Sequence, residues 1–261
     1  MYYLIYILAG LGAGIVTGLA GLSAAVIITP LLVGVCGWDG YDAVTVALAS
    51  DVLASLLTSY TYAKNKNIDI KRGLLIGVVA LIGTAIGSYC GYLFSQAQPN
   101  GLGYIAMITT ISLGVKFLAK PMNGGFDADS FGVQRKVNAK TLVAMISGLF
   151  IGFICGFTGS GGGILMLTVF TLLLGYNLKV AVGTSTMIMT FVAFVGTASH
   201  LSMGATVEFL PMLIVVITCV LGAWMAAKFA NKCKIERLNR VIGVVLLILG
   251  VLTISVKLFF R

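Results

Sequence analysis

Residues 156–163 read Gly-Phe-Thr-Gly-Ser-Gly-Gly-Gly, so five of these eight residues are glycine. The segment lies inside an apolar run, where an uninterrupted lipid-facing helix gains nothing from glycine, because glycine weakens helices. A broken helix beside a polar cavity does use this composition, since its free backbone N–H groups can face a solute. A fainter copy, Gly18-Leu19-Ala20-Gly21-Leu22-Ser23, lies near the start of the chain. We interpret the two breaks as halves of one solute-binding site.

A small anion is the solute that such a site favours. The N-terminus of a half-helix presents unpaired N–H groups and about half a positive charge. Two facing termini could therefore hold a sulfonate or a carboxylate without a full cation, and no lysine or arginine lies in the middle of an apolar run. The predicted substrate-binding residues are the glycines and hydroxyl side chains of the breaks and of two later segments: Gly18, Gly21, Ser23, Ser50, Thr158, Gly159, Ser160, Gly161, Gly162, Thr184 and Ser185.

Each of these residue types has an alternative interpretation. Glycines also allow close helix packing through small residues, although plain packing seldom needs three consecutive glycines such as Gly161–Gly163. Serines and threonines in helices often donate only to the carbonyl groups of their own helix. We favour a binding site over packing for the glycines, and both roles stay open for the hydroxyls.

Two ionisable side chains are candidates for coupling the solute to an ion. Asp51 is the one acid well inside an apolar run, and intramembrane acids are functional candidates because their burial is costly. It could carry a proton or pair with a cation; alternatively it caps a helix at the interface. His200, the sole histidine, ends another apolar run. An interfacial helix terminus is the favoured role for His200, and contact with substrate or proton is the second.

Composition restricts the class of protein. The chain has 261 residues, of which 59% are hydrophobic and only 10% charged, and its mean hydropathy is +1.06. A soluble domain carries roughly a quarter charged residues, so a multi-pass membrane protein is expected. The net charge of +9 comes from bases in the gaps between apolar runs, which is typical of cytoplasmic loops near anionic lipid. A lipid bilayer, and not a nucleic acid, is the expected partner. The five cysteines form no C-x-x-C pair, so no metal or cofactor is expected.

Eight apolar runs can be compared with the roughly 20 residues that a spanning helix needs. They cover about 2–33, 43–63, 73–95, 101–119, 141–174, 180–200, 207–227 and 241–260. The first and fifth runs extend beyond 30 residues, and these two contain the glycine breaks. Segment 18–21 matches 156–159 at an offset of 138, and 46–50 matches 182–186 after a two-residue slip. An internal repeat over nearly the whole chain is therefore expected.

The charges of the loops give the two repeats opposite orientations. The loop after the second run carries Lys64, Lys66, Lys71 and Arg72, whereas the equivalent loop near 201–206 has no base. After the third runs the pattern is reversed, with no base at 95–100 and five bases between 228 and 240. Equivalent loops of opposite charge lie on opposite sides of a membrane, which requires an odd number of crossings per repeat. Three spanning helices plus a re-entrant hairpin give an odd number of crossings. A long run that crosses the membrane twice, as two short helices, also keeps the number odd.

The predicted fold is an all-α polytopic membrane protein with two inverted repeats, each a broken re-entrant hairpin plus three transmembrane helices. Residues 1–119 form the first repeat, 120–140 a basic cytoplasmic linker and 141–261 the second repeat. Both termini would be external. The expected location is the cell membrane, which is the inner membrane in a bacterium. Whether the chain forms a homo-oligomer stays open.

With these segments in place, the chain resembles the TauE/SafE family of sulfite and organosulfonate exporters. The matching pieces are Gly156–Gly163, then Ala181-Val182-Gly183-Thr184-Ser185, then Ser199-His200 with Gly204 just beyond. The layout of two repeats around a basic linker also fits. The resemblance implies export of small sulfur-containing anions, which composition alone does not indicate.

The expected activity is therefore transport by alternating access around the two breaks, and not an enzymatic reaction. Outward movement of an anion is favoured by a negative interior, so export could run as a uniport, whereas uptake would require a proton or cation partner and would make Asp51 important. The alternatives are a passive anion channel and a proton-coupled carboxylate transporter. A serine protease is disfavoured because the G-x-S-G spacing fails at Ser160.

Overall fold

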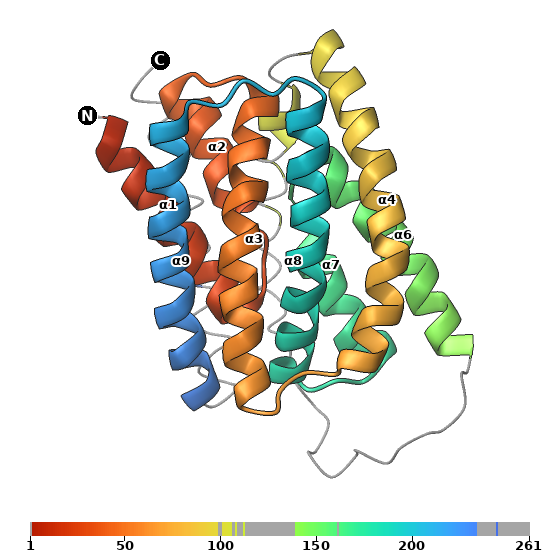
Figure 1. Cartoon of the computed structure of the whole chain (residues 1–261). Coiled ribbons are helices and arrows are strands. Elements are labelled where there is room, and N and C mark those ends of the chain that lie inside the picture. The colour runs from red at the N-terminus through yellow and green to blue at the C-terminus, as the bar shows by residue number, and fades with distance from the viewer. Residues whose placement is uncertain are drawn as a thin grey trace.

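The computed structural model describes residues 2–98, 101–105, 108, 112, 139–160, 162–233 and 244, and this part of the chain is helical without any strand (Figure 1). Five helices are long and apolar enough to cross a membrane: α1 (Tyr2–Ala20), α3 (Gly40–Lys64), α4 (Ile70–Ala97), α8 (Leu178–Ser202) and α9 (Phe209–Lys232). The predicted all-α polytopic membrane class is thus confirmed. The predicted third helices (101–119 and 241–260) and the linker 120–140 lie largely outside the described residues.

The outer faces of the helices are apolar. Large hydrophobic side chains on α4 and α9 point away from the bundle and are exposed: Leu74, Leu75, Val78, Ile82 and Ile86 on α4, and Ile217, Leu221, Met225 and Phe229 on α9. A water-soluble protein rarely exposes contiguous apolar surface of this extent. These faces are therefore suited to lipid.

Both overlong apolar runs are broken into two helices. Residues 21–24 separate α1 from α2 (Ala25–Cys36), and residues 159–161 separate α6 (Ala139–Thr158) from α7 (Gly162–Thr168), which continues as the π-helix η2 (Val169–Leu173). At 12 residues, α2 is about 18 Å long, which is too short to cross the ~30 Å hydrocarbon core. In Figure 1 the first hairpin starts and ends at the upper end of the molecule, and the second at the lower end.

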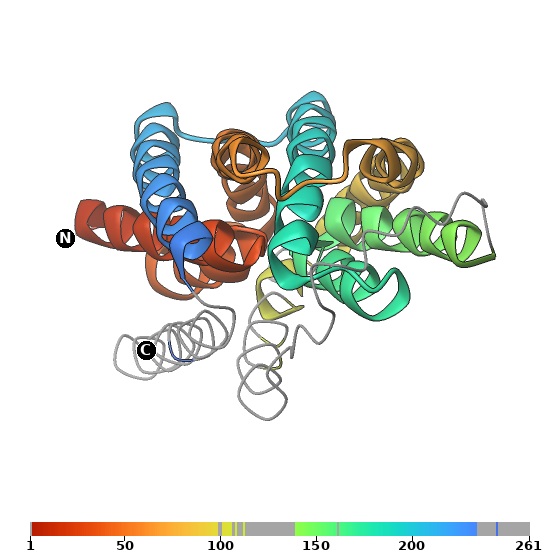
Figure 2. The same cartoon turned by 90° about the horizontal axis from the view of Figure 1, so that it is seen from below.

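The contacts between the long helices are symmetric. Helices α3 and α8 pack on each other at the centre, α1 packs along α9, and α6 packs along α4. In Figure 1, α3 and α9 run from the upper to the lower end, whereas α4 and α8 run from the lower to the upper end (Figure 2 gives the view along the bundle). The inverted relation of the two halves stays a prediction, and these directions favour it.

The backbone repeats at a constant offset. Positive φ angles occur at six described residues, which form three pairs 138 positions apart: Gly21 and Gly159, Gly37 and Gly175, and Lys66 and Gly204. Helices α3 and α8 begin and end at the same offset. The two-residue slip predicted for segment 46–50 is therefore wrong, because at the offset of 138 set by these turns Ser50 is equivalent to Ile188 and not to Thr186.

Small residues bring α1 close to α9 and α6 close to α4. A Cβ atom at Gly14 would lie 2.0 Å from the carbonyl oxygen of Cys219, and one at Gly152 would lie 2.0 Å from that of Ala80. Gly18, predicted to bind substrate, lies in the same contact, since its Cβ would lie 2.4 Å from the carbonyl oxygen of Ala223. At Gly18 the structure thus shows the packing role that was the alternative interpretation.

Candidate functional site

The two breaks begin with the same backbone turn. Gly21 and Gly159 have φ of 64° and 65°, a left-handed conformation that glycine adopts without a steric penalty. Their N–H groups donate to the carbonyl oxygens of Thr17 (2.8 Å) and Cys155 (2.7 Å), which ends α1 and α6 in the same way. The spacing of these glycines in the sequence is the signal that predicted both breaks.

The two breaks are in direct contact with each other. A Cβ atom at Gly163 would lie 2.3 Å from the carbonyl oxygen of Gly21 and 2.8 Å from the Cα of Leu22. The Ser23 Oγ lies 2.6 Å from the carbonyl oxygen of Gly159. Because even a methyl group does not fit at Gly163, the structure holds the breaks closed against each other.

Asp51 lies at this junction and not at the membrane interface. It is in the interior of α3, its side chain is fully buried, and its Oδ1 accepts the N–H of Ala24 at 2.8 Å. The other carboxyl oxygen, Oδ2, lies 2.6 Å from Ser23 Oγ. The interfacial cap considered for Asp51 is therefore wrong. Its carboxyl group occupies the start of α2, the position at which an anionic solute was predicted.

The other predicted substrate residues fall into two groups. Ser160, Gly162 and Ser185 lie at the junction: Ser160 is buried in the second break, a Cβ at Gly162 would lie 3.0 Å from Cys155 Sγ, and Ser185 Oγ would lie 2.9 Å from a Cβ at Gly21. Thr158 and Ser50 have partners in their own helices: Thr158 lies 2.9 Å from the carbonyl oxygen of Ile154, and Ser50 donates to the carbonyl oxygen of Val46. Thr184 accepts the N–H of Asp69, in the loop between α3 and α4. Gly161 lies outside the described residues.

Thr184 belongs to a polar network at the lower end of the bundle. Tyr176 donates to Asp69 Oδ2 at 2.5 Å, and Arg72 Nη1 lies 3.5 Å from the Tyr176 hydroxyl. Burial, together with the hydrogen bond to Asp69, raises the pKa of Tyr176, so this phenol stays protonated as a donor. The network joins the α3–α4 loop to the exit of the second hairpin, next to the start of α8.

His200 lies in the last turn of α8 and is buried. Its Nε2 lies 3.1 Å from the carbonyl oxygen of Gly156, and its Nδ1 lies 3.1 Å from Thr45 Oγ1. At the 138-residue offset His200 corresponds to Tyr62, whose hydroxyl donates to the carbonyl oxygen of Gly18 at 3.2 Å. Gly18 and Gly156 are themselves equivalent, so both side chains bind the last turn of a broken helix. His200 thus lies at a helix terminus, in the last turn of α8, as predicted, but it is buried against α6 and its partners are protein groups.

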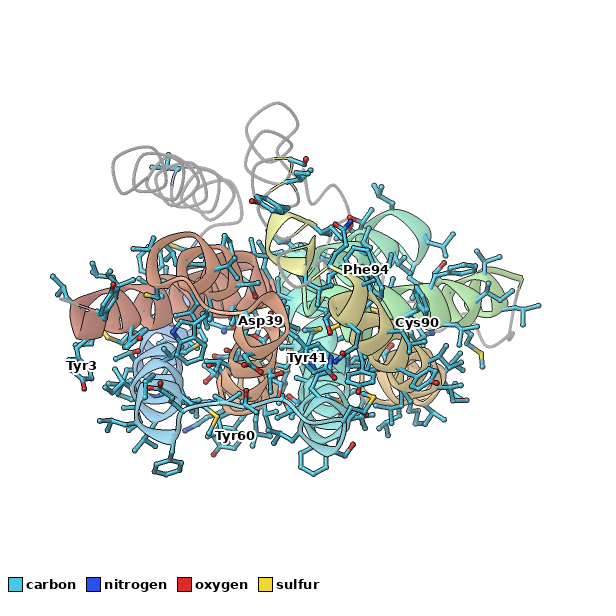
Figure 3. The ribbon with its side chains drawn as sticks, turned by 90° about the horizontal axis from the view of Figure 1, so that it is seen from above. Tyr3, Asp39, Tyr41, Tyr60, Cys90 and Phe94 are labelled. Atoms are coloured by element: carbon cyan, nitrogen blue, oxygen red, sulfur yellow. The ribbon has the colours of Figure 1, made fainter. Side chains whose placement is uncertain are left out.

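Sequence reasoning missed the side chains around His200. The ring of Tyr41 stacks on the imidazole with centroids 4.3 Å apart, and Tyr92 of α4 packs against Tyr41 edge-on. Figure 3, the view from above, shows Tyr41 in the middle of the bundle, whereas Tyr3 and Tyr60 lie toward its outside. The roles of Tyr62 and Thr45 were also missed, because residue type differs between the repeats and only backbone register reveals the equivalence.

We expect His200→Ala and Tyr62→Phe to destabilise the protein, because each leaves a buried carbonyl group at a helix end without its side-chain donor. The loss of one such partner costs about 1–3 kcal/mol. Melting temperatures in detergent measure the effect, and His200→Gln, which keeps an N–H donor, is expected to lose less than His200→Ala. A purely substrate-related histidine would leave the melting temperature of the empty protein unchanged.

Comparison with known proteins shows which family the chain is similar to. The family described as sulfite exporter TauE/SafE matches residues 6–253. Probable membrane transporter protein YunE of Bacillus subtilis (strain 168) is 28% identical over 264 residues, which is 96% of each chain. Probable membrane transporter protein YjnA of the same organism is 30% identical over 186 residues, which is 68% of this chain and 71% of YjnA.

A relative from a second organism is also named as a probable membrane transporter. Probable membrane transporter protein MJ0441 of Methanocaldococcus jannaschii is 22% identical over 259 residues, which is 94% of this chain and 92% of MJ0441. No solved structure matches the chain. The names of these relatives describe membrane transporters and not enzymes. The chain therefore belongs to the sulfite exporter TauE/SafE family of membrane transporters.

Proposed function

We propose that the protein moves small sulfur-containing anions, sulfite or a short sulfonate, out of the cell across the cell membrane (the inner membrane in a bacterium). One observation carries the proposal: two broken helices, which enter the bundle from opposite ends, meet at a junction where Ser23 of the first break contacts Gly159 of the second. The family supports the sulfur-containing class of anion.

The closed junction is one state of an alternating-access cycle. Each break belongs to a hairpin that opens toward a different end of the bundle. Withdrawal of one hairpin would expose the junction to one side of the membrane, and withdrawal of the other would expose it to the opposite side. The backbone N–H groups that this opening exposes and the hydroxyls of Ser23, Ser160 and Ser185 would then bind the anion.

The membrane potential favours the outward direction. Movement of one negative charge out of a negative interior gains about 2.3 kcal/mol per 100 mV. The charges at the helix ends favour a cytoplasmic position for the lower end of the bundle. Lys64, Lys71 and Lys232 lie at this end, where α3 and α9 finish and α4 starts, and lysines gather on the cytoplasmic side of membrane proteins.

A thermal-shift screen of the purified protein tests the substrate class. We expect sulfite or a short sulfonate to raise the melting temperature with a saturable dependence on concentration, because a ligand that binds only the folded state stabilises it. Thiosulfate and short carboxylates are the comparison ligands. A rise with carboxylates alone would replace the sulfur-containing class by a carboxylate transporter.

Flux in proteoliposomes then tests transport. We expect efflux of the anion that stabilises the protein to saturate with concentration at a modest turnover per protein. A rate that keeps rising with concentration to channel-like values would show a passive channel in place of alternating access.

A further inference from the structure

The Ser23 hydroxyl makes two short contacts at the junction, and together they require more protons than Ser23 carries. Ser23 Oγ lies 2.6 Å from Asp51 Oδ2 and also 2.6 Å from the carbonyl oxygen of Gly159. Oxygen atoms this close are separated by a proton, because 2.5–3.0 Å is the range of an O–H···O hydrogen bond. Two contacts therefore need two protons.

The Ser23 hydroxyl supplies only one of these protons. A serine hydroxyl has one donor and two acceptor lone pairs, and a carbonyl oxygen can only accept. The proton in the Ser23–Gly159 contact must therefore be the serine's own, so the proton in the Ser23–Asp51 contact must come from Asp51. The third position of Ser23 Oγ is filled by the N–H of Ala25 at 3.2 Å, which completes its set of partners.

The surroundings of Asp51 agree with a neutral carboxylic acid. Two ionisable side chains on neighbouring helices interact electrostatically with Asp51, the thiols of Cys155 on α6 and Cys219 on α9. Thiols carry no positive charge, so they do not stabilise a carboxylate. Its single backbone partner, the N–H of Ala24, is satisfied by Oδ1 whether or not Oδ2 is protonated.

We propose that Asp51 is the proton-binding site of this transporter: in the closed junction the protonated Asp51 donates to Ser23, and Ser23 donates to Gly159, so one bound proton fastens the first break to the second. When Asp51 loses this proton to water, the hydroxyl of Ser23 donates to the Asp51 carboxylate instead. The carbonyl oxygen of Gly159 then has no donor and faces a lone pair of Ser23 Oγ. The contact between the breaks is weakened and the junction opens.

The proton and the anion exclude each other from this junction. The closed, protonated contact has no room for a solute, since a methyl group at Gly163 already meets Gly21. An open junction, by contrast, frees Ser23 and the breaks for an anion. The protein without an anion would therefore pass through the closed state, between its two open states, only with a proton bound to Asp51. Anion moving outward would be exchanged for a proton moving inward. This exchange rests on the proposed anion transport; the protonation of Asp51 does not.

Infrared difference spectroscopy of the purified protein tests the proton site without any substrate. As the pH is raised, we expect the loss of one carbonyl band of a buried carboxylic acid in the wild type and in Asp39→Asn, and the absence of that band in Asp51→Asn. Asp39 is an exposed N-cap of α3, and asparagine caps helices as well as aspartate, so it is a matched control. Absence of an Asp51-dependent band at every pH at which the protein stays folded would overturn the proposal.

Efflux of a permanently ionised probe, ethanesulfonate, from proteoliposomes tests the exchange. We expect an acidic exterior to accelerate efflux from the wild type and from Asp39→Asn. Asp51→Asn is expected to lose efflux at least tenfold, because an amide N–H donates to Ser23 at every pH and keeps the junction closed. Acceleration that persists in Asp51→Asn, or an acid exterior without effect on a transporting wild type, would contradict the exchange. No ethanesulfonate efflux from the wild type would instead contradict the sulfonate part of the proposed function, and the infrared band would still decide the proton site.

Discussion

Gly163→Ala is expected to reduce anion transport by about tenfold to a hundredfold. The added methyl group would lie 2.3 Å from the carbonyl oxygen of Gly21 and 3.0 Å from the N of Ser23, so the breaks could no longer close on each other. Overpacking of this kind costs typically 1–3 kcal/mol, and each 1.4 kcal/mol is a factor of ten in a rate or population. Flux per folded protein in proteoliposomes is the measurement.

Gly77→Ala is the matched control for this variant. Gly77 is buried in α4, but a Cβ atom there would lie 3.6 Å from Ile188 Cγ1, which is an ordinary contact. In a helix interior alanine is favoured over glycine, so this variant should fold and transport as the wild type does. Wild-type flux in Gly163→Ala would show that transport does not require the closed junction.

Gly14→Ala and Gly152→Ala are expected to cause large losses of stability. In both, the new methyl group would lie 2.0 Å from a backbone carbonyl oxygen, that of Cys219 or that of Ala80, and a backbone cannot rotate out of the way as a side chain can. The helices would have to separate along their length, so we expect about 3 kcal/mol or more, at the upper end of overpacking costs. Melting temperatures in detergent measure the loss.

The two variants are also expected to resemble each other. Gly14 and Gly152 are 138 positions apart and make the same contact in the two halves, one with α9 and one with α4. Similar losses in both would support two equivalent interfaces. A large loss in one variant and none in the other would show that the halves are not energetically equivalent.

Much of the fold could be predicted because its main signals are local. The length of the apolar runs predicted the membrane class, and the glycines at 21 and 159 predicted where α1 and α6 end, since a left-handed turn there requires glycine. The offset of 138 was visible in the same glycines. The charges of the loops predicted hairpins that enter from opposite ends, and the directions of the helices favour that inverted arrangement.

The site was harder to predict because it depends on contacts between distant segments. A glycine pattern fits packing and binding equally well, and only the neighbours of Gly18 show that it packs against α9. His200 and Tyr62 have different side chains at equivalent positions, so comparison of residue types could not relate them. The burial of Asp51 depends on the two breaks meeting beside α3, which no local pattern of charge or hydropathy contains.

The chemical reactivity of a single thiol at Ser160 tests most directly whether the junction of the two breaks is the path of the anion. The measurement uses Ser160→Cys in a chain whose five natural cysteines are replaced, with a negatively charged methanethiosulfonate applied to one side of the membrane at a time. A buried thiol is inert and a water-exposed one reacts. We expect labelling from each side, slowed by excess ethanesulfonate, because the junction opens to both sides in turn. A Ser160→Cys protein that transports the anion while its thiol stays unreactive from both sides would place the path elsewhere and contradict the account.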